Sequence, residues 1–251
     1  MDLKDLTKLT KQEHFMLDTG IYLVFKHAND LDHLAKIKID PAHEDIEWQF
    51  DNGQSVHYQV TYSHNHRLST MLDTFVAESI DRQKHLKSNI DQYVFLTNLS
   101  FPLGKSYENP ANFKKGSHVT LYSKSMNDDQ RNAILNGFKK SPLNPKTKRF
   151  QKFFKAFWKR FVIEQPDFNE DDDISRSNQL LSRLLKTLQA KYTVTDNDLI
   201  VLAKLLKPIR QVLNCNLWAN NFDYQHHVYV PGSRLQAILK PNVDQLKPKQ
   251  A

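Results

Sequence analysis

Two alternating segments joined by a tight turn constrain the fold of this chain most strongly. Residues 44–50, EDIEWQF, place Ile46, Trp48 and Phe50 on one face of an extended strand, because side chains alternate with a period of two. Residues 54–63, QSVHYQVTYS, alternate in the same way. The intervening Asp51-Asn52-Gly53 is a strong hairpin-turn signal. The pattern predicts a β-hairpin with one apolar face and one polar face.

Helices and further strands flank this hairpin along the sequence. Apolar residues recur at helical spacing over 11–27 and 68–87. Residues 34–40 and 118–123 have strand composition, and 92–98 is a short continuous apolar run, which is typical of a buried strand. This order predicts an α/β class, with a mixed sheet flanked by helices.

The second half of the chain has a different character. From Asn127, a candidate N-cap, onward we predict helices over 128–140, 149–163, 177–192 and 196–213, the last kinked at Pro208. The tail from Pro241 is expected to be frayed. We therefore predict an α/β domain over residues 1–126, followed by a mostly helical C-terminal region over residues 127–251.

The charge of the chain favours a polyanionic partner. Lys and Arg number 35 against 28 Asp and Glu, giving a formal net charge of +7 and a pI near 9.3. Positive charge of this size attracts nucleic acid through counterion release. A generically basic protein with no such partner is the alternative. The six glycines form no Gly-rich phosphate-binding loop.

The expected location is the cytoplasm, without a membrane partner. No apolar stretch approaches the roughly 20 residues that span a bilayer. The first residues are polar and lack the apolar run of a secretion signal. The single cysteine, Cys215, excludes an intrachain disulfide and a cysteine-based zinc site.

Oxygen-bearing side chains gather around the predicted hairpin. Glu44 and Asp45 enter its first strand, and the second strand ends in Gln59-Val60-Thr61. Gln59 and Thr61 share a face, and in a short hairpin that face can lie beside Asp45. Carboxylate and amide oxygens are ligands that suit Mg²⁺. The alternative is a solvated strand entrance followed by ordinary solvent-facing residues.

These residues carry a resemblance to a known family. Glu44-Asp45-Ile46, a turn, and then His57-Tyr58-Gln59-Val60 resemble the motifs of the PD-(D/E)xK nuclease superfamily. More narrowly, residues 10–125 are similar to the dsDNA endonuclease domains of bacterial antiphage effectors of the CBASS type. The resemblance implies a restriction-endonuclease-like α/β fold, DNA as the substrate and Mg²⁺ as the cofactor.

The resemblance also assigns roles to residues. Asp45 matches the metal-binding acid, and Gln59 matches the Gln or Glu of the last motif. Glu13 or Gln12 on the first helix could complete the catalytic set, while Asp40 or Glu44 could assist in holding the metal.

The sequence departs from the family at one position. Thr61 stands where the motif lysine is expected, and threonine cannot supply its positive charge. A lysine from elsewhere could replace it, and the candidates are Lys26, Lys36, Lys38 and Lys84. Two alternatives therefore stay open: a metal-dependent DNA endonuclease, or a catalytically inactive DNA-binding or assembly subunit.

Candidate nucleic-acid contacts lie outside the hairpin. Arg67, beside His64 and His66, begins the predicted helix 68–87 and could contact a phosphate. Lys84 is a further candidate on that helix, and Lys152 and Lys159 belong to a basic stripe on the aromatic helix 149–163. Polar loop residues and a helix that simply buries its aromatic stripe are the alternatives.

The resemblance also bears on partners. Related effectors carry a sensing module or work with a partner ATPase, so we expect a second protein, such as a defence-system ATPase or sensor, as the trigger. The sequence leaves a homo-oligomer open, and a third alternative is an interaction protein with no role in nucleic-acid chemistry.

Overall fold

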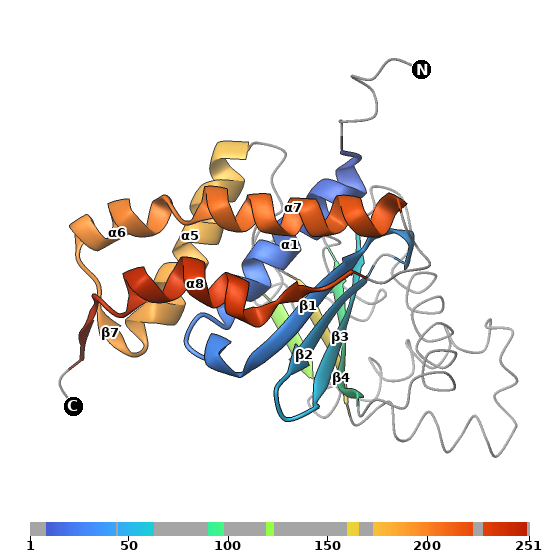
Figure 1. Ribbon diagram of the computed structural model, residues 1–251, viewed down its shortest axis with the longest axis horizontal. Coiled ribbons are helices and arrows are strands. Elements are labelled where there is room, and N and C mark those ends of the chain that lie inside the picture. The colour runs from blue at the N-terminus through green and yellow to red at the C-terminus, as the bar shows by residue number, and fades with distance from the viewer. Residues whose placement is uncertain are drawn as a thin grey trace, which may run out of the picture. The chain divides into compact units, whose positions relative to one another are not determined.

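The chain packs into two compact units. The computed structural model describes residues 9–43, 45–62, 90–97, 119–122, 160–165, 173–222 and 228–249 (Figure 1). Unit 1 combines Met1–Asn52 with Phe168–Ala251, and unit 2 spans Gly53–Asp167. Unit 1 therefore brings the two ends of the sequence into one core.

The first helix of unit 1, α1, spans Lys11–Lys26 and is buried along most of its length. A capping box starts it. The Glu13 N–H donates to Thr10 Oγ1 at 3.2 Å, and the Thr10 N–H donates to Glu13 Oε2 at 2.6 Å. This reciprocal pair satisfies two backbone donors that a helix start leaves open.

Three strands of unit 1 form an antiparallel arrangement. Strand β1, Leu34–Asp40, follows a short 3-10 helix at Leu31–His33. A second 3-10 helix, Pro41–His43, connects β1 to β2, Asp45–Phe50, and the two strands pair side by side. Strand β8, Val230–Pro231, pairs with the other edge of β1 at Lys36 and Ile37. The C-terminal part of the chain thus reaches the strand that the N-terminal part supplies.

Helices from the C-terminal half complete unit 1. They are α5 (Asp173–Gln189), α6 (Asp196–Ala203), α7 (Leu206–Phe222) and α8 (Gly232–Val243). Helix α1 packs against α5 and α7, and α7 and α8 both contact β1 (Figure 1). A Cβ at Gly20 would lie 3.0 Å from Ile39 Cδ1 and 3.2 Å from Leu213 Cδ1, so this glycine permits the close approach of α1.

Unit 2 contains a mixed sheet. Strands β3 (Ser55–Thr61), β4 (Ile90–Thr97) and β6 (Phe161–Gln165) are parallel neighbours in that order, and β5 (Val119–Tyr122) runs antiparallel beside β6. All six residues from Ser55 to Val60 are buried, as expected for a strand covered on both faces. The predicted α/β class, a mixed sheet with helices beside sheet strands, is confirmed.

The structure corrects three predicted elements. Phe161–Ile163 lie in β6 and not at the end of a helix, because an aromatic residue followed by two β-branched residues also suits a buried strand. The helix predicted over 196–213 is two helices, and Pro208 lies in the first turn of α7, where proline is tolerated. The tail is not frayed throughout, since Lys247–Pro248 form β9, which pairs with β7, Tyr192–Thr193.

Several predictions lie outside the described residues. These are the helix over 68–87, the helix that starts near Asn127, and residues 149–159 of the aromatic helix. The domain boundary between residues 126 and 127 falls in the same part of the chain and stays a prediction.

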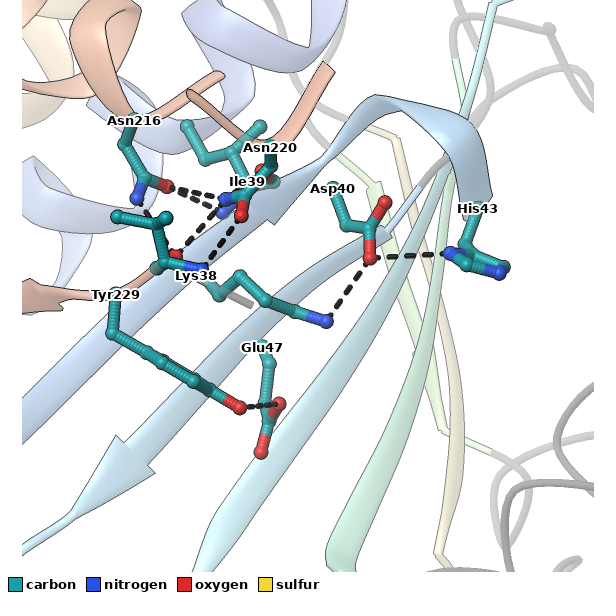
Figure 2. Close-up of polar contacts among 9 residues, drawn as sticks. Lys38, Ile39, Asp40, His43, Glu47, Asn216, Asn220 and Tyr229 are labelled. Atoms are coloured by element: carbon teal, nitrogen blue, oxygen red, sulfur yellow. Dashed lines mark hydrogen bonds and ion pairs between the residues drawn. The ribbon is translucent and has the colours of Figure 1, made fainter. Parts of the chain in front are cut away.

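Two asparagines of α7 hold the end of β1. The Ile39 N–H donates to Asn216 Oδ1 at 2.8 Å, and Asn220 Nδ2 donates to the Ile39 carbonyl at 2.9 Å. The same side chains bind the backbone of Val228, whose N–H donates to Asn220 Oδ1 at 2.8 Å (Figure 2). We call Asn216 and Asn220 the asparagine clamp. They supply hydrogen-bond partners to the backbone of β1 at Ile39, beyond the residues that pair with β8.

We predict that Asn220→Ala destabilises the protein by about 1–3 kcal/mol, because buried backbone groups of Ile39 and Val228 lose their partners. Urea unfolding followed by circular dichroism measures this. Gln211→Ala is the matched control on an exposed position of the same helix and should change stability by less than about 0.5 kcal/mol. Equal effects of the two substitutions would contradict the clamp.

Candidate functional site

The β1–β2 pair has two chemically different faces. Lys38 pairs with Glu47 across the strands, and Asp40 pairs with Asp45, so these four side chains share one face. The opposite face carries Ile37, Ile39, Ile46 and Trp48, all fully buried. We call the first the polar face; its members are Lys36, Lys38 and Asp40 on β1 and Asp45, Glu47 and Gln49 on β2.

The polar face is buried at the end where β1 meets the following turn. Asp45 is 0 % exposed, Asp40 is 3 % exposed and Lys38 is 6 % exposed. Burial of charged groups is costly unless opposite charges or hydrogen bonds compensate it. Three buried charged groups on two neighbouring strands therefore distinguish this end of the polar face from an apolar core.

Asp40 is the centre of the hydrogen bonds seen there. Lys38 Nζ and His43 Nδ1 each lie 3.1 Å from the same oxygen, Asp40 Oδ2 (Figure 2). Burial pushes the pKa of Asp40 upward, but the charges and hydrogen bonds of Lys38 and His43 outweigh it and hold that pKa below its ordinary value. Asp40 is therefore an ionised carboxylate at neutral pH.

The other end of the polar face is closed by Tyr229, which precedes β8. Its hydroxyl donates to Glu47 Oε2 at 3.2 Å (Figure 2). Lys36 Nζ lies 3.9 Å from the centre of its ring. Burial, and then the negative charge of Glu47, raise the pKa of Tyr229 to about 12. The phenol is thus neutral and acts as a donor at neutral pH.

The predicted site residues belong to different elements of the chain. Asp45 opens β2 on the polar face, whereas Gln59 is buried in β3 of unit 2 and Thr61 ends that strand. Glu13, predicted as catalytic, accepts the Thr10 N–H in the capping box of α1. A site that joins Asp45 to Gln59 or Glu13 stays a prediction.

The other residues with a predicted site role lie outside the part of the chain that the structure describes. They are Glu44, proposed as a metal ligand, and the candidate nucleic-acid contacts Arg67, Lys84, Lys152 and Lys159.

Two features of the structure, the Tyr229–Glu47 hydrogen bond and the buried Glu164, were not predicted from the sequence. The bond between Tyr229 and Glu47 joins positions 182 residues apart, and no local pattern signals it. Glu164 on β6 is 1 % exposed, and its negative charge adds to burial in raising the pKa of Tyr58. The strand composition of Phe161–Gln165 is the sequence signal that could locate Glu164. The helix predicted over 149–163 covers most of that strand and hides the signal.

The donor set of the polar face fits a hard divalent cation. Asp40 and Asp45 present carboxylates from directly paired positions. Mg²⁺ commonly takes one or two carboxylates and completes its shell with water and substrate phosphate oxygens. Within the described residues there is no group of three His, Cys, Asp or Glu side chains that could hold a metal.

We predict that Lys38→Met destabilises the protein by about 3–5 kcal/mol at neutral pH, because it leaves Asp40 buried without its ammonium. In the wild type, the stability that Asp40 contributes is complete above its ordinary pKa and is lost as pH falls through its lower folded pKa. In the variant, the pKa of Asp40 should rise, so this loss moves to higher pH.

Urea unfolding at a series of pH values measures both effects. Lys240→Met is the matched control, because Lys240 pairs with Asp32 at 3.3 Å on the exposed surface, where an ion pair contributes about 0–1 kcal/mol. Superimposable pH profiles for the two variants would contradict the assigned pair.

Comparison with known proteins identifies a fold but no family. No protein-family model matches the sequence, and no curated protein matches it. Among the described residues, no helix is long and apolar enough to cross a membrane.

Solved structures of Cap4 proteins resemble the chain. The Moraxella osloensis Cap4 SAVED/CARF-domain containing receptor matches with a TM-score of 0.51 and 8 % identity, over 94 % of this chain and 49 % of that one. The Acinetobacter baumannii Cap4 SAVED/CARF-domain containing receptor with the cyclic trinucleotide 3′3′3′-cAAA matches with a TM-score of 0.50 and 11 % identity, over 90 % and 44 %. The chain thus spans about half the length of these receptors, and it shares their fold over that part.

Proposed function

We propose that this chain is a nuclease-fold subunit of a bacterial antiphage defence system, and that it binds DNA and cleaves it with a divalent metal such as Mg²⁺. Two independent likenesses support the proposal. The motifs around Asp45 and Gln59 resemble those of antiphage endonuclease domains, and the fold resembles part of the Cap4 receptors. The first likeness concerns the chemistry, and the second concerns the architecture.

The observation that carries the proposal is the pair of buried carboxylates on the polar face. Asp40 and Asp45 occupy directly paired positions and are 3 % and 0 % exposed. Acids buried side by side repel each other unless cations compensate them. Lys38 and His43 contact Asp40, and a divalent ion at Asp45 would add positive charge to the same face.

Each residue has a defined part in the proposed reaction. Asp45 would hold the metal, with Gln59 and Glu44 as further candidate ligands and Glu13 as an accessory acid of the predicted catalytic set. A bound Mg²⁺ would polarise the phosphate and lower the pKa of a coordinated water. A water molecule would add to phosphorus and release one proton to solvent, the P–O ester bond would break, and the departing oxygen would take up a proton from solvent.

DNA binding would draw on the excess positive charge of the chain. The net charge of +7 favours association with a polyanion. Arg67, Lys84, Lys152 and Lys159 are the proposed phosphate contacts. Lysine and arginine contacts of this kind supply affinity that is independent of base sequence and weakens with added salt.

A second candidate function follows from Thr61. A neutral side chain at the lysine position favours a catalytically inactive subunit that binds DNA or assembles with a partner. The partner would be a defence-system ATPase or sensor. The Acinetobacter baumannii Cap4 structure described above contains the cyclic trinucleotide 3′3′3′-cAAA, so a nucleotide signal is the trigger that we propose to test first on such a partner.

We predict that Asp45→Asn lowers the rate of plasmid cleavage in Mg²⁺ or Mn²⁺ by about 10²–10³-fold, because the metal that would offset the charge of the reacting phosphate loses a ligand. Agarose gel electrophoresis of supercoiled plasmid measures the rate. Asp30→Asn is the matched control, since Asp30 forms an exposed pair with Lys191 at 3.6 Å.

The outcomes separate the two candidate functions. Unchanged cleavage by Asp45→Asn would exclude the assigned metal site. An absence of cleavage by the wild type with its partners present, together with salt-sensitive DNA binding, would favour the inactive subunit. An absence of salt-sensitive DNA binding would remove both.

A further inference from the structure

Lys38 occupies an unusual environment for a lysine. It lies in the middle of β1, is 6 % exposed, and places its ammonium 3.1 Å from the carboxylate of Asp40. Lysine is rarely buried, and a buried ion pair contributes little net stability compared with apolar residues of the same size. Stability alone therefore gives little reason for a charged pair at this position.

The other candidate lysines have different surroundings. Lys36 Nζ lies 3.9 Å from the centre of the Tyr229 ring, and Lys26 Nζ lies 5.9 Å from the centre of the Tyr22 ring. Lys84 lies outside the described residues. Lys38 forms an ion pair with Asp40, a carboxylate of the polar face.

The position of the Lys38 ammonium relative to Asp45 follows from the strand register. Asp40 pairs directly with Asp45, and directly paired side chains start about 4.5–5.5 Å apart at Cβ. Figure 2 shows the Lys38 side chain running toward the Asp40 end of the strand. An ammonium has three donors, so a bond to Asp40 leaves donors that can reach a further acceptor.

The acids of the polar face make a positive charge necessary for a phosphate to approach it. The face carries the carboxylates of Asp40, Asp45 and Glu47, whereas Tyr229 stays neutral because its pKa is about 12. A phosphate approaching these acids alone would be repelled. A divalent ion at Asp45 and the ammonium of Lys38 together would offset that repulsion.

We infer that the Lys38 ammonium, which lies 3.1 Å from Asp40 Oδ2, is the positive charge that contacts the substrate phosphate at the polar face. This inference rests on the proposed function, because it assigns a residue of that same site. Lys38 thereby takes the part that Thr61 cannot perform.

The test compares variants that keep or remove the ammonium in the same electrostatic background. Lys38→Met alone leaves Asp40 buried and could unfold the chain. The comparison therefore uses Asp40→Asn, which keeps Lys38, and the double variant Lys38→Met/Asp40→Asn, which removes both charges of the pair. Lys240→Met is the control for the loss of one lysine charge outside the polar face, because Lys240 forms an exposed pair with Asp32.

Two measurements are made on the full chain. The first is plasmid cleavage in Mg²⁺. The second is the affinity for a short DNA duplex in Ca²⁺, measured by fluorescence anisotropy at constant ionic strength. Ca²⁺ also accepts oxygen ligands, so this reports phosphate contact without requiring turnover.

We expect the double variant to cleave about 10²–10³-fold more slowly than Asp40→Asn, and to bind the duplex in Ca²⁺ about tenfold more weakly. Lys240→Met should match the wild type in both measurements. Equal duplex affinity for Asp40→Asn and the double variant would overturn the inference, whether or not the wild type cleaves. Absent cleavage by the wild type, with the affinity difference intact, would instead count against the proposed nuclease activity alone.

Discussion

The register between β1 and β2 is the constraint on which the rest of this site depends. It places Ile37, Ile39, Ile46 and Trp48 on one side and Lys38, Asp40, Asp45 and Glu47 on the other. A shift of one residue would exchange the two faces and drive four charged groups into the apolar core of unit 1. The burial of Trp48 and its isoleucine neighbours therefore specifies where the carboxylates stand.

The C-terminal half of the chain keeps this register in place. The asparagine clamp binds both backbone groups of Ile39, which lies between Lys38 and Asp40. Tyr229 reaches Glu47 at the other end of the polar face. Gly232 begins α8 so close to β1 that a Cβ there would lie 1.8 Å from the Leu34 carbonyl oxygen. Contacts from segments almost 200 residues away in sequence thus hold this short pair of strands in place.

Local patterns were sufficient to predict most of the individual elements. Strand β1 was predicted over its full length, and α1 within one residue, because a period of two and a helical period are short-range signals. The same signals were misleading where they conflict. Phe161, Val162 and Ile163 continue a helical aromatic pattern and yet belong to a buried strand. Pro208 was expected to kink a helix that in fact restarts just before it.

The site was harder to predict because its contacts are long-range. Asp45, Asp40 and Lys38 were all named as candidates, but the sequence could not select Lys38 from four lysines. The selection needed the fold, which puts Lys36 against Tyr229 and leaves Lys38 beside Asp40. The two asparagines of α7 had no signal, since their partners are backbone groups up to 181 residues away.

The central claim is that the polar face holds a divalent cation through Asp45. Anomalous X-ray scattering from crystals of the full chain soaked in Mn²⁺ tests it most directly. The account predicts a peak about 2–2.2 Å from an Asp45 carboxylate oxygen, which is the distance expected for a small hard cation. Mn²⁺ bound elsewhere in the molecule, with no peak at the polar face, would contradict it.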